Sequence, residues 1–263
     1  MKRAAGIVYD DRGAGDLPIV CLHGIGGDTG SFGPQLERLS EGRRVIAWNM
    51  PGYGGSDAIS PVTFEGLSAA LIRFLDVLGL SRVHLAGQSI GGMIALETAV
   101  RYPERVAGLS LIATTPAFGG RDESFKEAFV AARLKPLDEG MTLADLAKRF
   151  VPEITGPDTS AEALAAATAS MAAVPEATYR DIIACLVTFN RRAEISDLDL
   201  PVCVIAGGFD TNAPAKTMAS MAAKISGAEY HLIEQAGHLV NLEAGDETNT
   251  ILANFHNKLE GQP

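Results

Sequence analysis

The sequence predicts an α/β protein with a mostly parallel sheet that carries helices on both faces. Strand-like apolar runs alternate with segments of helical periodicity along most of the chain, as expected for such a sheet. Several of these runs are continuously apolar, which is typical of strands covered on both faces. Between about residues 117 and 196 the strands stop and short helical patterns replace them, which indicates an insertion into the sheet.

An alternating run at residues 6–11 predicts an early edge strand. The further strands are expected at residues 17–22, 44–48, 82–86, 106–113, 202–206 and 229–233. Helical patterns are expected at residues 64–78, 93–101, 214–225 and 243–259. Ligands of such proteins bind at the carboxyl ends of the strands, so the loops that follow the strands are the place to look for a site.

The insertion contains four Ala-rich helical patterns, at residues 124–134, 143–150, 160–173 and 176–189. Prolines at positions 136, 152, 157 and 175 are expected to separate these helices. We therefore predict a core of residues 1–116 and 197–263 and a helical cap of residues 117–196.

Composition excludes several classes of protein. The formal net charge of −10 argues against a nucleic-acid partner, and no apolar run is long enough to span a membrane. Three widely separated cysteines without a C-x-x-C pair argue against a disulfide framework or a zinc site. Because the N-terminus also lacks an apolar signal segment, we expect a cytoplasmic protein. Assembly as a homo-oligomer is left open.

The sequence from Gly87 to Gly91 has the pattern G-x-S-x-G, with a strand-like run before it and a helical pattern after it. In this setting the serine lies at a sharp turn, and the two glycines leave room for that turn. The following helix directs its free N–H groups and positive dipole end toward the serine oxygen. We therefore predict that Ser89 is a nucleophile; the alternative is a serine that only caps the helix.

A serine needs a base, and the base needs a carboxylate that orients it. His238 follows the last strand, whereas two other histidines lie within strands and one within the terminal helix. Asp210 ends the preceding strand; its alternative role is to cap the next helix. Asp197 and Asp199 are weaker candidates because they precede that strand.

The oxyanion of such a reaction requires two backbone donors. The N–H of Ile90, directly after the serine, is one candidate. The other is the N–H of Ile25, in a glycine-rich loop that includes Gly24 and Gly26 and follows a buried strand. His23 in the same loop is expected to be structural, with its ring tying the loop to the neighbouring strand.

These motifs, in this order, resemble those of capped α/β-hydrolases that act on small molecules. The loops at residues 23–27, 49–56, 87–92, 207–214 and 236–243 match the oxyanion, glycine-rich, nucleophile, acid and histidine loops of that family. Asn49 departs from the family pattern, which has Asp there, and puts the usual hydrogen bonds of that loop in question. Within the family the chain is most similar to 3-oxoadipate enol-lactonases and carboxylesterases.

The resemblance implies a serine hydrolase that cleaves an ester, a lactone or a related carbonyl compound through an acyl-enzyme, without a metal or cofactor. Alternatives are a carbon–carbon bond hydrolase of ring-fission products, a cofactor-free haloperoxidase-like enzyme, and a small-ligand receptor that retains the triad. Specificity is expected to lie in the cap. Its basic residues are expected on a solvated face, and one that pointed inward would indicate a substrate with a carboxylate. They are Arg121, Lys126, Arg133, Arg149, Arg191 and Arg192.

Overall fold

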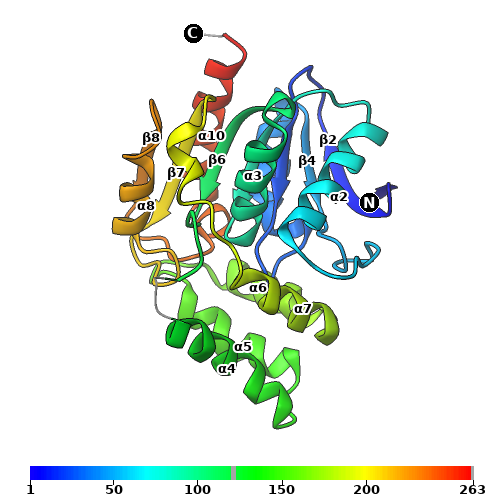
Figure 1. Ribbon diagram of the computed structural model, residues 1–263, viewed down its shortest axis with the longest axis vertical. Helices are drawn as coiled ribbons and strands as arrows, with labels where there is room; N and C mark the ends of the chain where they lie inside the picture. Colours follow the sequence, from blue (N-terminus) through cyan, green and yellow to red (C-terminus); the bar gives the residue numbers. More distant parts are fainter. Residues whose placement is uncertain (120–122, 262–263) are drawn as a thin grey trace.

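The computed structural model describes residues 1–119 and 123–261 and contains one eight-stranded sheet (Figure 1). The strand order is β1-β2-β4-β3-β5-β6-β7-β8, in which β3 to β8 run parallel and β1 and β2 are antiparallel to their neighbours. The strands are Lys2–Ala4 (β1), Ile7–Arg12 (β2), Ile19–Leu22 (β3), Val45–Trp48 (β4), Val83–Gln88 (β5), Val106–Ile112 (β6), Val202–Gly207 (β7) and Glu229–Ile233 (β8). The predicted fold class is confirmed.

Helices cover both faces of this sheet, and successive residues of each central strand serve opposite faces. On one face, Val20, Leu85 and Val204 pack against α2 (Phe64–Val77), α3 (Ile90–Arg101) and α8 (Ala215–Ala222). On the other, Cys21 and Ala86 pack against α1 (Gly33–Arg38) and α10 (Gly245–Leu259). This double burial explains why the central strands are continuously apolar in sequence.

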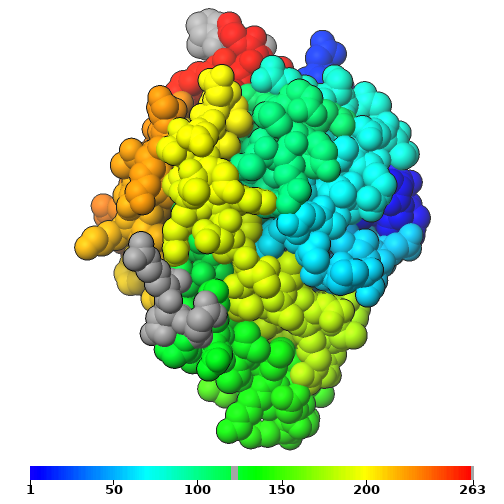
Figure 2. All heavy atoms as spheres, in the orientation of Figure 1, coloured from blue at the N-terminus to red at the C-terminus, as the bar shows by residue number. Residues whose placement is uncertain are grey.

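Four further helices lie between β6 and β7 in the chain and gather at one end of the molecule, beyond the carboxyl ends of the strands (Figures 1 and 2). They are α4 (Glu123–Asp138), α5 (Leu143–Ile154), α6 (Ala161–Ala172) and α7 (Glu176–Leu186). We refer to residues 117–196 as the helical segment. The Phe118 N–H donates to Phe189 O at 2.9 Å, and the Arg191 N–H donates to Pro116 O at 2.8 Å, so the two ends of the segment are joined.

An ion-pair network fastens the outgoing end of the segment to the core. Glu97 of α3 is buried and pairs with Arg191 at 2.6 Å and also with Arg101. Burial alone would raise the pKa of Glu97, but hydrogen bonds from the two arginines outweigh it and hold the pKa below its ordinary value.

Three expectations about elements are wrong. The strand predicted at residues 6–11 is not the edge, because the three-residue β1 pairs outside it. Pro136 and Pro152 do not separate helices: each lies in the last turn of its helix, two residues before the end, where a proline removes a single helical hydrogen bond. The terminal helix is interrupted at Ala244, which separates α9 (Val240–Glu243) from α10.

Short 3₁₀ turns complete the elements, at Thr29–Phe32, Leu39–Glu41, Pro103–Arg105 and Glu194–Asp197. Among the described residues, no helix has the length and apolar character needed to cross a bilayer.

Candidate active site

Ser89 occupies a strained turn between β5 and α3. Its backbone has φ 55° and ψ −123°, a conformation that residues other than glycine rarely adopt. A methyl group on Gly87 would collide with the backbone of Gly91, and one on Gly91 would collide with the carbonyl of Leu22 in β3. The two glycines of the motif are therefore required by close backbone approach, and the turn presents a half-buried serine at the edge of the sheet.

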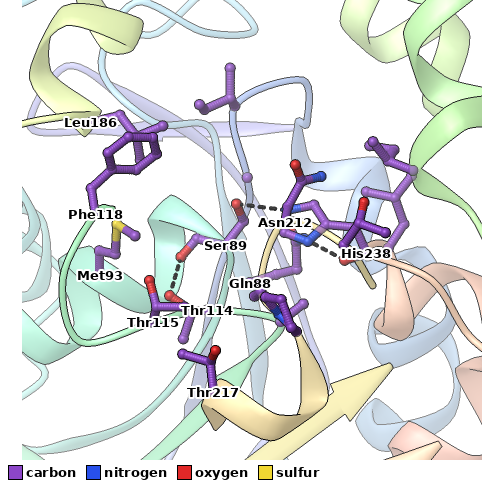
Figure 3. A pocket seen from close by; sticks show the side chains of 18 of the residues that line it. Gln88, Ser89, Met93, Thr114, Thr115, Phe118, Leu186, Asn212, Thr217 and His238 are labelled. Atoms are coloured by element: carbon purple, nitrogen blue, oxygen red, sulfur yellow. Dashed lines mark hydrogen bonds between the residues drawn. The ribbon is translucent and has the colours of Figure 1, made fainter. Parts of the chain in front are cut away.

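The serine hydroxyl faces an imidazole (Figure 3). His238 Nε2 lies 3.0 Å from Ser89 Oγ, and His238 Nδ1 lies 2.8 Å from Asp210 Oδ2. The three side chains come from the loops after β5, β7 and β8, so the parallel sheet brings together residues that are up to 149 positions apart. The geometry suits proton transfer from the hydroxyl to the imidazole, which the carboxylate orients.

Asp210 is buried but well supplied with donors. Its Oδ1 accepts hydrogen bonds from the N–H groups of Asn212 at 2.8 Å and Ala213 at 3.0 Å. Burial would raise the pKa of Asp210, but the charge and hydrogen bond of His238, with the two backbone donors, hold that pKa below its ordinary value. The sequence left two roles open for this carboxylate, capping the next helix or orienting the histidine. In the structure it accepts hydrogen bonds from the turn that follows it and also contacts His238. Within the described part of the chain, neither Asp197 nor Asp199 forms a hydrogen bond or ion pair with His238, which pairs with Asp210.

The backbone around His238 is fixed by three contacts from other parts of the chain. Gln88 Nε2 donates to the carbonyl of His238 at 2.8 Å, and the His238 N–H donates to Ile154 O, in the helical segment, at 2.7 Å. The Glu243 carboxylate accepts from the N–H groups on either side of the histidine, those of Gly237 at 2.9 Å and of residue 239 at 2.8 Å. Gln88 was not singled out from the sequence, although it lies inside the G-x-S-x-G motif.

Glu243 also reaches the helical segment. Its Oε2 accepts hydrogen bonds from the N–H of Gly156 at 2.6 Å and from Thr159 Oγ1 at 2.8 Å, a hydroxyl whose single proton is shared with Gly156 O at 2.7 Å. One carboxylate therefore joins the α5–α6 connection to the histidine loop.

Two backbone N–H groups are available beside the serine hydroxyl. The Ile90 N–H is the first of α3, and the Ile25 N–H follows Gly24; among the described residues, neither donates to a backbone acceptor. A Cβ placed on Gly24 would lie 3.2 Å from Ser89 Cβ, so this loop passes directly beside the serine. Gly26 touches the helical segment, since a Cβ there would lie 3.1 Å from Met171 Cβ. The glycine loop and the start of α3 thus lie next to Ser89, each with an N–H that has no backbone acceptor.

His23 holds the glycine loop in place. Its Nδ1 bonds to Gly24 O at 2.7 Å, and its Nε2 accepts the N–H of Met50, directly after β4, at 2.9 Å. Burial lowers the pKa of His23 to about 4, only partly opposed by the bond to Gly24, so the ring is neutral at physiological pH. The ring ties the loop after β3 to the loop after β4, as expected.

Asn49 forms two hydrogen bonds that hold the loop of residues 49–56. Its Oδ1 accepts the N–H of Thr29 at 2.9 Å, and its Nδ2 donates to Gly54 O at 3.2 Å. An aspartate could accept the first bond but could not donate the second. The departure from the family pattern is therefore structural.

A cavity of about 890 Å³ opens above Ser89 between the core and the helical segment. Its volume is in the range of small-molecule sites. Figure 3 shows Met93, Phe118 and Leu186 on one side of the serine and Asn212 and His238 on the other. Every helix of the helical segment contributes at least one wall residue: Phe129 from α4, Phe150 from α5, Met171 from α6 and Tyr179 from α7.

The basic residues of the helical segment do not all lie on a solvated face. Arg149 does, with 66% of its side chain exposed. Arg191 is instead paired with Glu97, and Arg133 is turned inward and lines the cavity. Arg192 lines the cavity mouth and donates to Gly119 O. Arg121 lies outside the described residues.

Arg133 turns inward because α4 and α5 each present an aromatic ring to its guanidinium. The guanidinium carbon lies 3.4 Å from the centroid of the Phe129 ring and 4.9 Å from that of Phe150. The expectation of a solvated side chain at this position is wrong.

Comparison with known proteins agrees with this fold. The family model of the alpha/beta hydrolase fold matches residues 18–245. The chain is 32% identical over 95% of its length to the dihydrolipoyllysine-residue acetyltransferase component of the acetoin cleaving system of Pseudomonas putida, and it spans 66% of that protein.

Two solved structures are similar over nearly the whole chain. A thermophilic esterase from Thermogutta terrifontis has a TM-score of 0.87 at 25% identity, covering 96% of this chain and 93% of the esterase. The enol-lactonase from Burkholderia xenovorans LB400 has a TM-score of 0.85 at 24% identity, covering 95% and 96%, a likeness that shows the fold alone.

The chain therefore belongs to the α/β-hydrolase fold family, as its motifs predicted, and hydrolases are among its relatives and structural neighbours.

Proposed function

We propose that this protein is a serine hydrolase that cleaves an ester or lactone of a small molecule through an acyl-enzyme on Ser89. The observation that carries the proposal is the continuous chain of contacts from Ser89 Oγ through His238 to Asp210, at 3.0 and 2.8 Å. The similarity to a thermophilic esterase at 25% identity is consistent with this chemistry.

In the first half-reaction, His238 Nε2 takes the proton of Ser89 as the oxygen attacks the substrate carbonyl. Asp210 stabilises the imidazolium and holds its Nδ1 proton. The N–H groups of Ile25 and Ile90 stabilise the negative charge on the carbonyl oxygen. The tetrahedral intermediate collapses, and the leaving group departs with the proton from His238.

In the second half-reaction, His238 activates a water molecule, which attacks the acyl carbon and releases the acid and the free serine. All of these steps use side chains and backbone groups of the chain, so the reaction requires no metal or organic cofactor.

The helical segment is proposed to act as a cap that selects the substrate, with the core formed by residues 1–116 and 197–263. Its four helices supply much of the cavity wall, whereas the proposed reacting groups all come from the core. Three buried free cysteines suit a reducing compartment, which favours the cytoplasm as its location.

The test is covalent labelling combined with rapid kinetics. A serine-directed phosphonate is expected to add one equivalent of mass, located at Ser89, and to abolish turnover of p-nitrophenyl acetate. Ser89→Ala is expected to remain folded, to escape labelling, and to lower kcat at least ~10³-fold. Labelling at another residue, or turnover retained by Ser89→Ala, would contradict the proposal.

A panel of lactones, small esters and diketone ring-fission products then separates the reaction classes. Hydrolysis of the diketones alone would favour carbon–carbon cleavage. Binding without an acyl-enzyme burst from any ester would favour a receptor that retains the triad.

A further inference from the structure

The charge inside the cavity is opposite to the charge of the whole protein. The chain has a formal net charge of −10, yet the described residues that line the cavity include four cations and no carboxylate. The cations are Arg133, Arg192, Lys216 and Lys224. Asp210 lies behind His238 with its carboxylate fully covered. An anion inside the cavity would therefore meet only positive formal charges along its walls.

Of these cations, Arg133 is half-buried, whereas the other three are exposed. Its guanidinium stacks on Phe129, and its one hydrogen bond to a described residue is a long contact of 3.4 Å to Phe129 O. Burial lowers the pKa of Arg133 to about 10, and the neighbouring Tyr179 opposes this only in part. Among the described residues no carboxylate pairs with it, whereas Arg180 and Arg191 each pair with two.

A guanidinium has five N–H donors in a planar fork that matches a carboxylate. Arg133 lines the cavity with most of these donors unused by described residues, so a carboxylate in the cavity could accept charge-assisted hydrogen bonds from them. Tyr179 also lines this cavity, and the positive charge of Arg133 partly opposes the rise that burial causes in the pKa of Tyr179. The other walls of the cavity are largely apolar, so an apolar spacer would fit between this subsite and Ser89.

We propose that Arg133 forms a carboxylate subsite and that the substrate is an ester or lactone that carries a free carboxylate away from the scissile carbonyl. This inference rests on the proposed hydrolase function and adds the substrate class. The three more exposed cations at Arg192, Lys216 and Lys224 attract the anion to the cavity, and Arg133 fixes its orientation.

The experiment compares two esters of similar length: mono-p-nitrophenyl glutarate, which is anionic, and p-nitrophenyl valerate, which is neutral. The wild type is expected to favour the anionic ester in kcat/KM. Arg133→Met keeps an apolar stem over the aromatic rings but loses the charge. It is expected to lower the ratio of the two kcat/KM values at least ~10-fold, mainly through KM, because a charge-assisted hydrogen-bond pair is lost.

Arg133→Lys is expected to recover part of the preference, since it restores the charge without the fork. Arg149→Met is the matched control: it removes the same charge from the same segment at an exposed position and should leave the ratio unchanged. A ratio that stays unchanged in Arg133→Met would overturn the subsite. If kcat/KM for both esters fell equally, the arginine would only support packing.

A binding measurement tests the carboxylate subsite independently of catalysis. Calorimetry on Ser89→Ala is expected to show binding of glutarate, and the double variant with Arg133→Met is expected to lose it at least ~10-fold. Should the wild type hydrolyse neither ester while glutarate still binds through Arg133, the hydrolase proposal fails and the subsite stands. Should the neutral ester be hydrolysed while glutarate does not bind, the subsite fails and the hydrolase proposal stands.

Discussion

Replacing Glu243 by glutamine should weaken both the fold and the proposed catalytic centre, because one carboxylate accepts four hydrogen bonds there. Three donors, the N–H groups of Gly156 and Gly237 and the hydroxyl of Thr159, meet at Oε2, and the N–H of Leu239 meets Oε1. His238 lies between residues 237 and 239, so its backbone is held on both sides by the same group.

The magnitude follows from counting these bonds. The amide oxygen of glutamine can replace Oε2 and keep three donors, but as a neutral acceptor, at a loss of about 1 kcal/mol for each bond. Its NH₂ group then faces the N–H of Leu239, donor against donor, and leaves that bond unmade. Glu243 is only half-buried, so water recovers part of the loss. We expect the free energy of unfolding to fall by ~3 kcal/mol and kcat to fall roughly 10- to 100-fold as the imidazole shifts.

The assay is urea unfolding followed by circular dichroism, with kcat measured on p-nitrophenyl acetate. Glu139→Gln is the control, since Glu139 is an exposed carboxylate whose lysine partner lies 3.7 Å away. The variant of Glu243 should unfold at a clearly lower urea concentration than the control. An unfolding midpoint and a turnover rate that both match the control would refute the reasoning.

Three further changes probe other parts of the structure. Asp210→Asn should keep the fold but place an NH₂ group against His238 Nδ1, which favours the wrong tautomer of the imidazole. The measured kcat should fall about 10³–10⁴-fold. A kcat near that of wild type would exclude this carboxylate as the orienting group. Gly91→Ala should lower the free energy of unfolding by about 3 kcal/mol, because the added methyl group would collide with the Leu22 carbonyl. Urea unfolding measures this change, and an unchanged unfolding midpoint would argue against the close approach of the two backbones. The pKa of Glu97 is lowered in the folded protein, so its ion pairs stabilise the fold fully above the unfolded pKa of about 4.3, and this stabilisation is lost as pH falls through the lower folded pKa. The free energy of unfolding, measured between pH 3 and 7, should therefore fall less with acid in Glu97→Gln than in wild type. Parallel plots of that free energy against pH would contradict this.

The sequence contained enough information for the sheet and for the loops that follow its strands. Strands buried on both faces are continuously apolar, and in a parallel sheet their carboxyl ends meet at one edge. The positions of Ser89, Asp210 and His238 in the chain therefore predicted that the three side chains would come together, and the structure places them in contact. The prediction needed no knowledge of the helical segment.

The details that were missed depend on contacts between distant residues. The inward turn of Arg133 depends on Phe129, one turn earlier in α4, and on Phe150 in α5, and a basic residue in a mixed helix has no periodic signal for this orientation. The edge strand β1 has only three residues, too few to display an alternating pattern. The link from Glu243 to residue 156 spans 87 positions and involves a backbone N–H, which the sequence does not distinguish.

The contacts of Ile154 and Gly156 with the histidine loop and Glu243 limit how freely the helical segment of this chain can be replaced. A chimaera whose insert followed another backbone path here would lose the acceptor for the His238 N–H and two of the four donors to Glu243, even if the new helices packed well. A chimaera designed for a new substrate should therefore keep Ile154 and the α5–α6 connection of this chain and exchange only other parts of the helical segment.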